Sequence, residues 1–421
     1  MTYRLDDLEV PAGAPFQNDS LERQPLVEFL SKLIKNLNGP FVMALDSPWG
    51  SGKTTLVRML MEHLKGGGFQ CIYFNAWKVD YVTDPLIALV SSIDRMDLGT
   101  GETNNNYKEH LKSVKKVTTL LAKRGLAAGA KALTCGILDF KKEWEAAASE
   151  IAAGTVEDIV DAFNQECDLL KKFREALTSA VKQLPAADKK RPLIFFIDEL
   201  DRCRPTFAID LLERVKHLFD IPNIVFMLSI DKQQLEASTK AVYGASINAT
   251  EYLRRFIDLE YSIPAVNSKH YTKNLLIRFE LDTIFSNNPM NAYDRNHFIE
   301  FFTQLSHAMD LSLRARERCI TRLRIVMDQL PDNSYLDPML IALLIVLRSN
   351  HPQLFHRFVR DGALAEKELK EYLVPLPGGG ELYSEFQKRI SRGSRITDLI
   401  DGKEELARVV DKIDLVTRVQ E

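Results

Sequence analysis

Residues 41–65 constrain the fold of this chain more than any other segment. An apolar run at 41–45 ends in Asp46-Ser47-Pro48, which predicts a buried strand that leads into a turn. A glycine-rich stretch follows, Trp49-Gly50-Ser51-Gly52-Lys53-Thr54-Thr55, and apolar residues then recur on one helical face over 54–65. The segment therefore predicts a strand, a tight loop and a helix in direct succession.

Four further apolar runs have the length of buried strands. They lie at 71–74, 193–197, 224–230 and 257–263. Helical stretches separate the runs, which predicts crossover connections and a parallel sheet covered by helices on both faces. The predicted fold class is therefore α/β, and the periodic stretches after residue 263, at 268–286, 294–309, 312–330 and 336–348, predict a helical region that follows the sheet.

Composition places the 421-residue chain among soluble globular proteins. Hydrophobic residues make up 45% and charged residues 27%, which excludes disordered and fibrous classes. The net charge of −3 carries no whole-chain signature of a nucleic-acid or membrane binder. The five cysteines lie far apart without CxxC spacing, which argues against a disulfide framework and a zinc site. We therefore expect a cytoplasmic protein, and Asp6 and Asp7 at the start argue against a secretory signal.

More than 100 residues separate the second and third predicted strands, which requires an inserted helical element. Residues 108–142 hold nine basic and two acidic residues, a net +7, and residues 143–168 hold eight acidic and no basic residues, a net −8. Opposite charges favour an antiparallel helical hairpin, while a basic face for anionic lipid or nucleic acid and a disordered arm stay open. The apolar stretch 117–138 contains Lys123, Arg124 and Lys131, and we expect it not to span a membrane.

The glycine-rich stretch has the composition of a phosphate-binding loop. It matches G-x-x-x-x-G-K-[ST] except that Ser47 replaces the first glycine, a position that opens the turn. Gly50 and Gly52 let backbone N–H groups point at phosphate oxygens, and the following helix adds its positive end. We expect residues 49–55 to bind the nucleotide, with Lys53 on the β- and γ-phosphates and the Thr54 hydroxyl on Mg²⁺.

The run 193–197 delivers two carboxylates, Asp198 and Glu199, at the carboxyl end of a strand, where open α/β sheets bind ligands. We expect Asp198 to hold Mg²⁺ through water and Glu199 to be the general base for the attacking water. Asp201 is the alternative base, and carboxylates that only cap a helix are the remaining alternative. Asp201 and Arg202 could instead form an ion pair that holds the turn.

Several motifs resemble those of the KAP family of P-loop NTPases, on the AAA+/STAND side of the P-loop proteins. They are Trp49-Gly50-Ser51-Gly52-Lys53 in the loop, Asn75-Ala76-Trp77 after the second strand and Asp198-Glu199-Leu200-Asp201-Arg202-Cys203 after the third. Residues 19–23, 225–231 and 252–256 are also similar to family blocks. An aspartate is usual where this chain has Glu199. The resemblance covers about residues 15–95 and 190–330.

The resemblance implies a three-layer α/β fold with parallel strand order 5-1-4-3-2, a helical lid, and nucleoside triphosphate hydrolysis with ATP and Mg²⁺ as ligands. We expect a P-loop NTPase core at 1–98 and 186–265, an inserted helical element at 99–185, a lid at 266–350 and a C-terminal helical region at 351–421. Many family members carry transmembrane helices after the second strand, and we expect none here. We expect a homo-oligomer and a protein partner at the insertion or C-terminal region, while nucleic acid and peripheral membrane contact stay open.

The resemblance also suggests roles for residues outside the two motifs. Ser229 or Asp231, at the end of the strand beside the loop, would sense the γ-phosphate, or would only cap the strand end. Arg254 and Arg255 stand where AAA+ proteins place an arginine finger that acts across a subunit interface, with surface salt bridges as the alternative. Trp77 is expected to pack in the core, with a ligand contact as the alternative.

Arg314 resembles the lid arginine that contacts the triphosphate. It recurs with Arg318 and Arg322 at i, i+4 and i+8, so a solvated or nucleic-acid-facing stripe competes with that role. Taken with the two motifs, the chain is expected to be a magnesium-dependent ATPase that acts as a nucleotide-driven switch, with a bacterial role in defence against phage or plasmids. A slow ATP-gated scaffold or signalling module and a nucleic-acid-stimulated motor are the alternatives.

Overall fold

The computed structural model describes residues 5, 8–37, 39–82, 84–96, 102–127, 156–184, 191–218, 220–264, 269–282, 291–329, 338–360, 362–393 and 413. Its centre is a sheet of five parallel strands, β1 (Phe41–Asp46), β2 (Cys71–Asn75), β3 (Leu193–Asp198), β4 (Ile224–Ile230) and β5 (Leu259–Ser262). The strands lie in the order β2-β3-β4-β1-β5. This confirms the predicted α/β class and the order 5-1-4-3-2, counted from the other edge.

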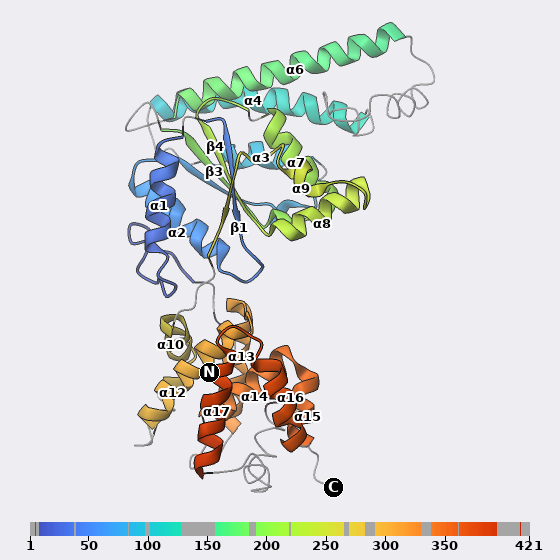
Figure 1. The fold of residues 1–421 in the computed structure, drawn as a ribbon. Coiled ribbons are helices and arrows are strands. Elements are labelled where there is room, and N and C mark those ends of the chain that lie inside the picture. The colour runs from blue at the N-terminus through green and yellow to red at the C-terminus, as the bar shows by residue number, and fades with distance from the viewer. Residues whose placement is uncertain are drawn as a thin grey trace.

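Helices cover both faces of the sheet, because side chains that alternate along each strand are buried on opposite sides. One face packs on α1 (Gln24–Lys35) and α2 (Lys53–Gly66) through Met43, Phe196 and Met227. The other face packs through Phe195 and Phe226 on α3 (Pro85–Asp94), α7 (Pro205–Leu218), α8 (Lys232–Tyr243) and α9 (Ala249–Leu253). Figure 1 shows the resulting three layers, with α1 and α2 on one side of the strands and α7 to α9 on the other.

The insertion after α3 contains two long helices, α4 (Glu102–Ala127) and α6 (Val156–Lys182), which lie side by side across the end of the sheet domain (Figure 1). In their described parts they contribute apolar side chains, among them Leu111 and Val114 of α4 and Phe173 and Leu177 of α6, to the core beneath them. Residues 128–155 lie outside the described residues, and they include much of the oppositely charged stretches. In the described chain no helix combines the length and the apolarity that a membrane crossing requires.

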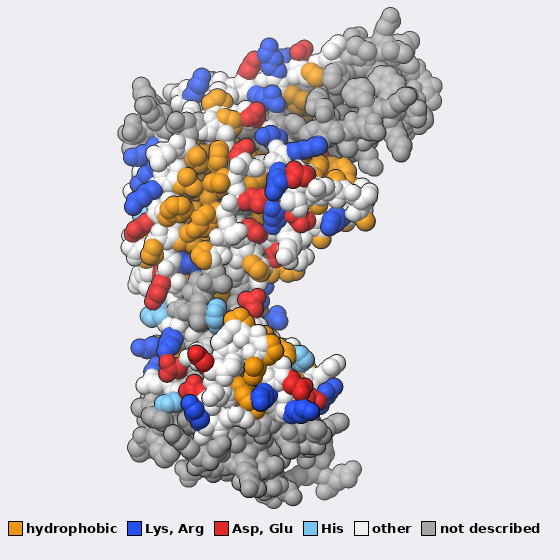
Figure 2. Space-filling view, viewed as in Figure 1, with side chains coloured by type: hydrophobic (Ala, Val, Ile, Leu, Met, Phe, Trp, Pro, Cys, Tyr) orange, Lys and Arg blue, Asp and Glu red, His pale blue; other side chains and the backbone are white. Residues whose placement is uncertain are grey.

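The chain after β5 forms a second, helical body. Its helices are α10 (Lys269–Arg278), α12 (Asn291–Ala308), α13 (Leu313–Gln329), α14 (Pro338–Asn350), α15 (Pro352–Arg360), α16 (Gly362–Leu373) and α17 (Gly379–Gly393). The core of this body surrounds α14, whose residues 339–347 are all buried. The molecule narrows between the sheet domain and the helical body (Figure 2), and the start of α13 lies against the loop after β1.

Candidate functional site

Parallel pairing gathers polar side chains at the carboxyl edge of the sheet. Asn75 pairs in register with Asp198, and Asp198 pairs with Ser229. Alternation along the strands places these residues in line with Ile194, Phe196, Val225 and Met227, whose side chains face α2. The sheet therefore directs an amide, a carboxylate and a hydroxyl toward the helix that follows the glycine-rich loop.

The loop between β1 and α2 curls as its glycines predict. Gly50 has φ 78° and Gly52, the residue before the helix, has φ 86°, a conformation that strains any residue with a Cβ. Lys53 begins α2, and its Nζ donates to the carbonyl oxygens of Ser47 and Pro48. Burial lowers the pKa of Lys53, and the nearby carboxylates of Asp201, Asp231, Asp198 and Asp46 oppose that shift.

Two observations indicate that this loop is built for an anion. The Lys53 ammonium donates to two carbonyl oxygens of its own loop, and these acceptors are neutral, so neither of them balances its positive charge. The Ser51 hydroxyl is buried and has no hydrogen-bond partner within the described chain. A buried hydroxyl without a partner costs free energy, about 1–3 kcal/mol, unless a ligand supplies one. The oxygens of a bound phosphate would offer hydrogen-bond acceptors to both groups.

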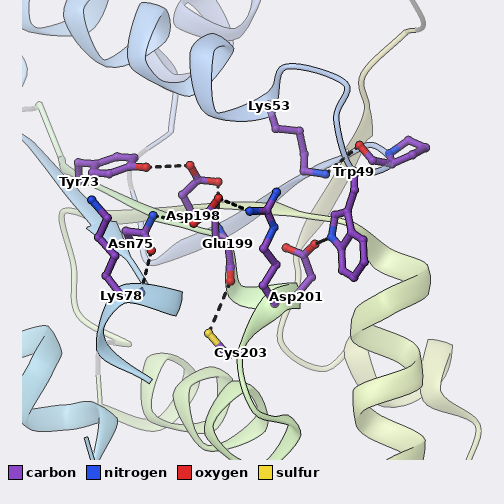
Figure 3. A network of polar contacts seen from close by, with 11 residues as sticks. Trp49, Lys53, Tyr73, Asn75, Lys78, Asp198, Glu199, Asp201 and Cys203 are labelled. Atoms are coloured by element: carbon purple, nitrogen blue, oxygen red, sulfur yellow. Dashed lines mark hydrogen bonds and ion pairs between the residues drawn. The ribbon is translucent and has the colours of Figure 1, made fainter. Parts of the chain in front are cut away.

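The turn after β3 holds Asp198 and Glu199 in different ways. The Tyr73 hydroxyl donates to Asp198 Oδ2 over 2.9 Å, and burial together with the charge of Asp198 raises the pKa of Tyr73, so the hydroxyl keeps its proton. Glu199 adopts the left-handed conformation, with φ 60° and ψ 27°. Its Oε2 accepts a hydrogen bond from Asn75 Nδ2 over 2.8 Å (Figure 3). Its Oε1 pairs with Arg202 Nη1 over 2.7 Å.

Asp201 lies beside the loop, buried, and the Trp49 indole N–H donates to its carboxylate (Figure 3). Burial raises the pKa of Asp201, while the Trp49 hydrogen bond and the charge of Lys53 oppose the shift. The alternative in which Asp201 and Arg202 form an ion pair is wrong, because Arg202 pairs with Glu199 and Asp201 accepts the hydrogen bond from Trp49.

A cavity of about 340 Å³ connects these groups, and it has the size of a small-molecule site. It brings together the predicted residues Trp49, Gly50, Ser51, Gly52, Lys53, Thr54, Thr55, Asp198, Glu199, Asp201 and Arg314. Sequence reasoning missed other lining residues, namely Arg23, Arg58, Tyr73, Asn75, Lys78, Arg202, Tyr271, Arg278 and Glu317. The signals for Arg23 and Asn75 were present, since both stand in stretches that resemble family blocks, but nothing local pointed to Arg278 or Tyr271.

The start of α13 forms one wall of the cavity. A Cβ added to Gly50 would lie 3.0 Å from Ser312 Oγ and 3.1 Å from Arg314 Cβ, and the Arg314 N–H approaches the Gly50 carbonyl oxygen at 3.4 Å. Arg318 is exposed, and Arg322 donates to the Ile413 carbonyl oxygen. The three arginines therefore have three different surroundings, and Arg314 alone of them lines the cavity.

The other predicted residues lie at its edge or away from it. Ser229 is buried and does not line the cavity, and its hydroxyl has no partner within the described chain. Asp231, which is also outside the lining, caps α8 and accepts a hydrogen bond from the Trp49 backbone N–H. Arg254 and Arg255 are exposed between α9 and β5, where Arg254 pairs with Glu251, and neither lines the cavity. Their role across a subunit interface stays a prediction.

Trp77 is the predicted residue that the structure places most differently. The expectation of core packing is wrong, because 51% of its surface is exposed. The physical reason is that β2 ends at Asn75 and the chain turns into a short 3-10 helix, Trp77–Val79, on the surface. The Trp77 ring lies under the Arg202 guanidinium, with Arg202 Cζ 5.6 Å from the ring centroid.

The donor set suits a nucleotide with a hard metal ion. Thr54 and Asp198 supply oxygen, the ligand atom that Mg²⁺ prefers. Within the described residues no cluster of three or more His, Cys, Asp or Glu side chains could hold a metal by itself.

Comparison with known proteins supplies a family. The model of the KAP family P-loop domain matches residues 23–330. No curated protein matches the chain. Among solved structures, the chain is similar to the Aeropyrum pernix ORC2 protein in its ADPNP-ADP complexes, with 14% identity, 94% of each chain covered and a TM-score of 0.38. The ADP form of the same protein matches with 13% identity, 97% of this chain, 95% of that chain and a TM-score of 0.34.

Proposed function

Since the chain belongs to the KAP family of P-loop NTPases, we propose that it is a magnesium-dependent ATPase whose nucleotide state sets the position of its helical lid. The observation that carries the proposal is the single cavity in which the phosphate loop, the carboxylates after β3 and the start of α13 meet. Each of these parts contributes one requirement of phosphoryl transfer, which is phosphate charge neutralisation, activation of water and closure over the nucleotide.

The residues of the cavity divide these tasks. The backbone N–H groups of the loop and Lys53 bind the β- and γ-phosphates, and the start of α2 adds its positive end. Glu199 accepts a proton from water as the water oxygen bonds to the γ-phosphorus and the bond to the β,γ-bridging oxygen breaks, which leaves ADP and inorganic phosphate. Thr54 and Asp198 would hold Mg²⁺, which when bound neutralises charge on the phosphate oxygens.

Lid movement follows from the contact between Gly50 and α13. The loop contacts the lid at Ser312 and Arg314. A conformational change of the loop when phosphate binds or leaves therefore shifts the start of α13. ATP hydrolysis then moves the helical body relative to the sheet. The outcome of the reaction is this conformational change and not a metabolite. A role in defence against phage or plasmids stays a prediction from the family resemblance.

Two substitutions test the separate roles. Lys53→Ala removes phosphate charge, so nucleotide binding is expected to be lost. Glu199→Gln keeps shape and removes the base, so binding is expected to persist while turnover falls by about 10²–10⁴-fold. Nucleotide affinity is measured by calorimetry and turnover by phosphate release, with and without Mg²⁺.

Equal loss of nucleotide affinity in both variants contradicts the assignment. If the Glu199→Gln enzyme turns over at the wild-type rate, the role of general base is assigned to Asp201. Tight ATP binding by the wild-type protein without measurable phosphate release favours the ATP-gated scaffold instead, and a rate that rises only with added DNA or RNA favours the nucleic-acid motor.

A further inference from the structure

Arg202 is a cation of the cavity that the roles above do not use. It lines the cavity together with residues of the loop, and its Nη1 pairs with Glu199 Oε1 over 2.7 Å. Both side chains are largely buried, with 23% of Arg202 and 17% of Glu199 exposed. The pair is thus better shielded from solvent than a surface salt bridge, and the guanidinium stands next to the expected base.

Trp77 gives this guanidinium a fixed support. Its ring centroid lies 5.6 Å from Arg202 Cζ, and Arg202 lines the cavity whereas Trp77 does not, so Trp77 contacts the guanidinium without occupying the cavity. The electrons of an aromatic face attract a cation placed over it. The contact with the Trp77 ring orients the Arg202 guanidinium, and it is weak enough for the guanidinium to change its partner.

Glu199 has a second partner that does not depend on Arg202. Asn75 Nδ2 donates to Oε2, while Arg202 occupies Oε1. If Arg202 leaves, the carboxylate keeps its orientation through Asn75 and gains a free oxygen that can accept a proton from water. The two contacts are therefore separable in function.

We propose that Arg202 exchanges partners during the cycle, leaving Glu199 to pair with the γ-phosphate of bound ATP and returning to Glu199 after phosphate is released. This rests on the proposed function, in which Glu199 is the base. The γ-phosphate offers more negative charge than one carboxylate and a bidentate geometry that guanidinium matches. The exchange frees the base and places a positive charge on the group where charge develops, both at the moment ATP arrives.

Trp77 is a positioning residue in this scheme, since it acts on the phosphate only through Arg202. The scheme differs from an arginine supplied by another subunit because every residue in it belongs to one chain. An arginine that contacts the γ-phosphate raises the rate of hydrolysis by about 10³–10⁵-fold, whether it comes from the same chain or from another subunit.

The decisive measurement is the ratio of affinities for a non-hydrolysable ATP analogue and for ADP. Arg202→Ala is expected to weaken analogue binding by about 10–100-fold, the loss of a hydrogen bond between charged groups, and to leave ADP binding within about twofold. Arg202→Lys keeps the positive charge without the planar guanidinium, and its affinity for the analogue is expected to lie between those of the wild type and Arg202→Ala. Arg204→Ala is the matched control, because Arg204 pairs with Asp80 and does not line the cavity.

Turnover supplies the second readout. Arg202→Ala is expected to lower kcat by about 10³-fold or more, and Trp77→Ala by about three- to tenfold, with Trp77→Phe restoring most of the loss because it keeps an aromatic face. Unchanged ADP binding shows that each variant is folded. An unaltered ratio of analogue affinity to ADP affinity in Arg202→Ala overturns the exchange. A rise in kcat overturns it as well, because it would show that Arg202 only holds Glu199.

The two proposals can fail separately. A wild-type protein that releases no phosphate contradicts the ATPase, yet the affinity ratio of Arg202→Ala still reports whether the guanidinium contacts the γ-phosphate. A wild-type ATPase whose Arg202→Ala variant keeps both its ratio and its kcat leaves the ATPase intact and removes the exchange.

Discussion

The Trp49 indole N–H donates to the Asp201 carboxylate, and this bond joins the phosphate loop after β1 to the turn after β3. The carboxylate is buried, and burial raises its pKa more than the Trp49 hydrogen bond and Lys53 lower it. The folded protein therefore holds the Asp201 proton more tightly than the unfolded chain does. The stability that this proton confers is complete below the ordinary Asp pKa, about 3.9, and is lost as pH rises through the raised value.

Asp201→Asn is accordingly expected to raise the melting temperature of the nucleotide-free protein at neutral pH, because asparagine has no charge to bury. The gain should shrink as pH falls and vanish at about pH 4, where the native carboxyl is protonated as well. Trp49→Phe removes the opposing hydrogen bond and should lower the melting temperature at neutral pH. Thermal unfolding across this pH range checks both; a loss of stability in Asp201→Asn that is equal at every pH contradicts the argument.

Gly50→Ala tests the contact between the loop and the lid. The residue has φ 78°, and the new Cβ would meet Ser312 Oγ at 3.0 Å, so we expect a cost of about 1–2 kcal/mol from the left-handed conformation alone. We expect weaker nucleotide binding and easier proteolysis between β5 and α13 as the lid is pushed away. Gly66→Ala is the control, because that helical position has open space around it. Equal effects of the two substitutions would show that the contact is unimportant.

Arg314→Ala tests the lid arginine. Its side chain is in the cavity lining and its backbone lies against Gly50, so removal is expected to weaken ATP binding by about tenfold, as for one charged hydrogen bond. Arg318→Ala, one turn further along α13 and outside the cavity lining, should bind ATP like the wild type. If both variants lose nucleic-acid binding and neither loses ATP affinity, the arginines form a nucleic-acid-facing stripe.

One of the two arginines Arg254 and Arg255 is expected to act on the nucleotide of a neighbouring chain. Both are exposed and outside their own cavity, so they reach a phosphate only in an oligomer. Specific activity should then rise with protein concentration. A mixture of Arg254→Ala/Arg255→Ala chains with Lys53→Ala chains should recover partial turnover, since each supplies what the other lacks.

The same mixture separates these arginines from Arg202. Chains with Arg202→Ala should gain nothing from Lys53→Ala chains, because Arg202 serves its own cavity. Turnover per chain that is constant on dilution, together with an inactive mixture, would assign Arg254 and Arg255 to the surface.

Local patterns were enough to predict the sheet and the loop. A buried parallel strand needs a continuous apolar run, and a phosphate loop needs glycine and lysine at set positions, so β1 to β4 and the residues around Lys53 follow from a few neighbouring residues. β5 is shorter than the run 257–263 suggested, because only Leu259–Ser262 pairs with β1 at the edge of the sheet.

The sequence by itself thus determined the α/β class, the phosphate loop and the two carboxylates after β3, since each depends on residues that are adjacent along the chain. Only the tertiary structure decided which groups meet them. Asn75 reaches Glu199 because β2 pairs with β3, Trp77 supports Arg202 because the chain after β2 turns onto the surface, and Arg314 lies against Gly50 although more than 260 residues separate them. These contacts depend on long-range pairing and packing, which leave no local pattern in the residues that make them.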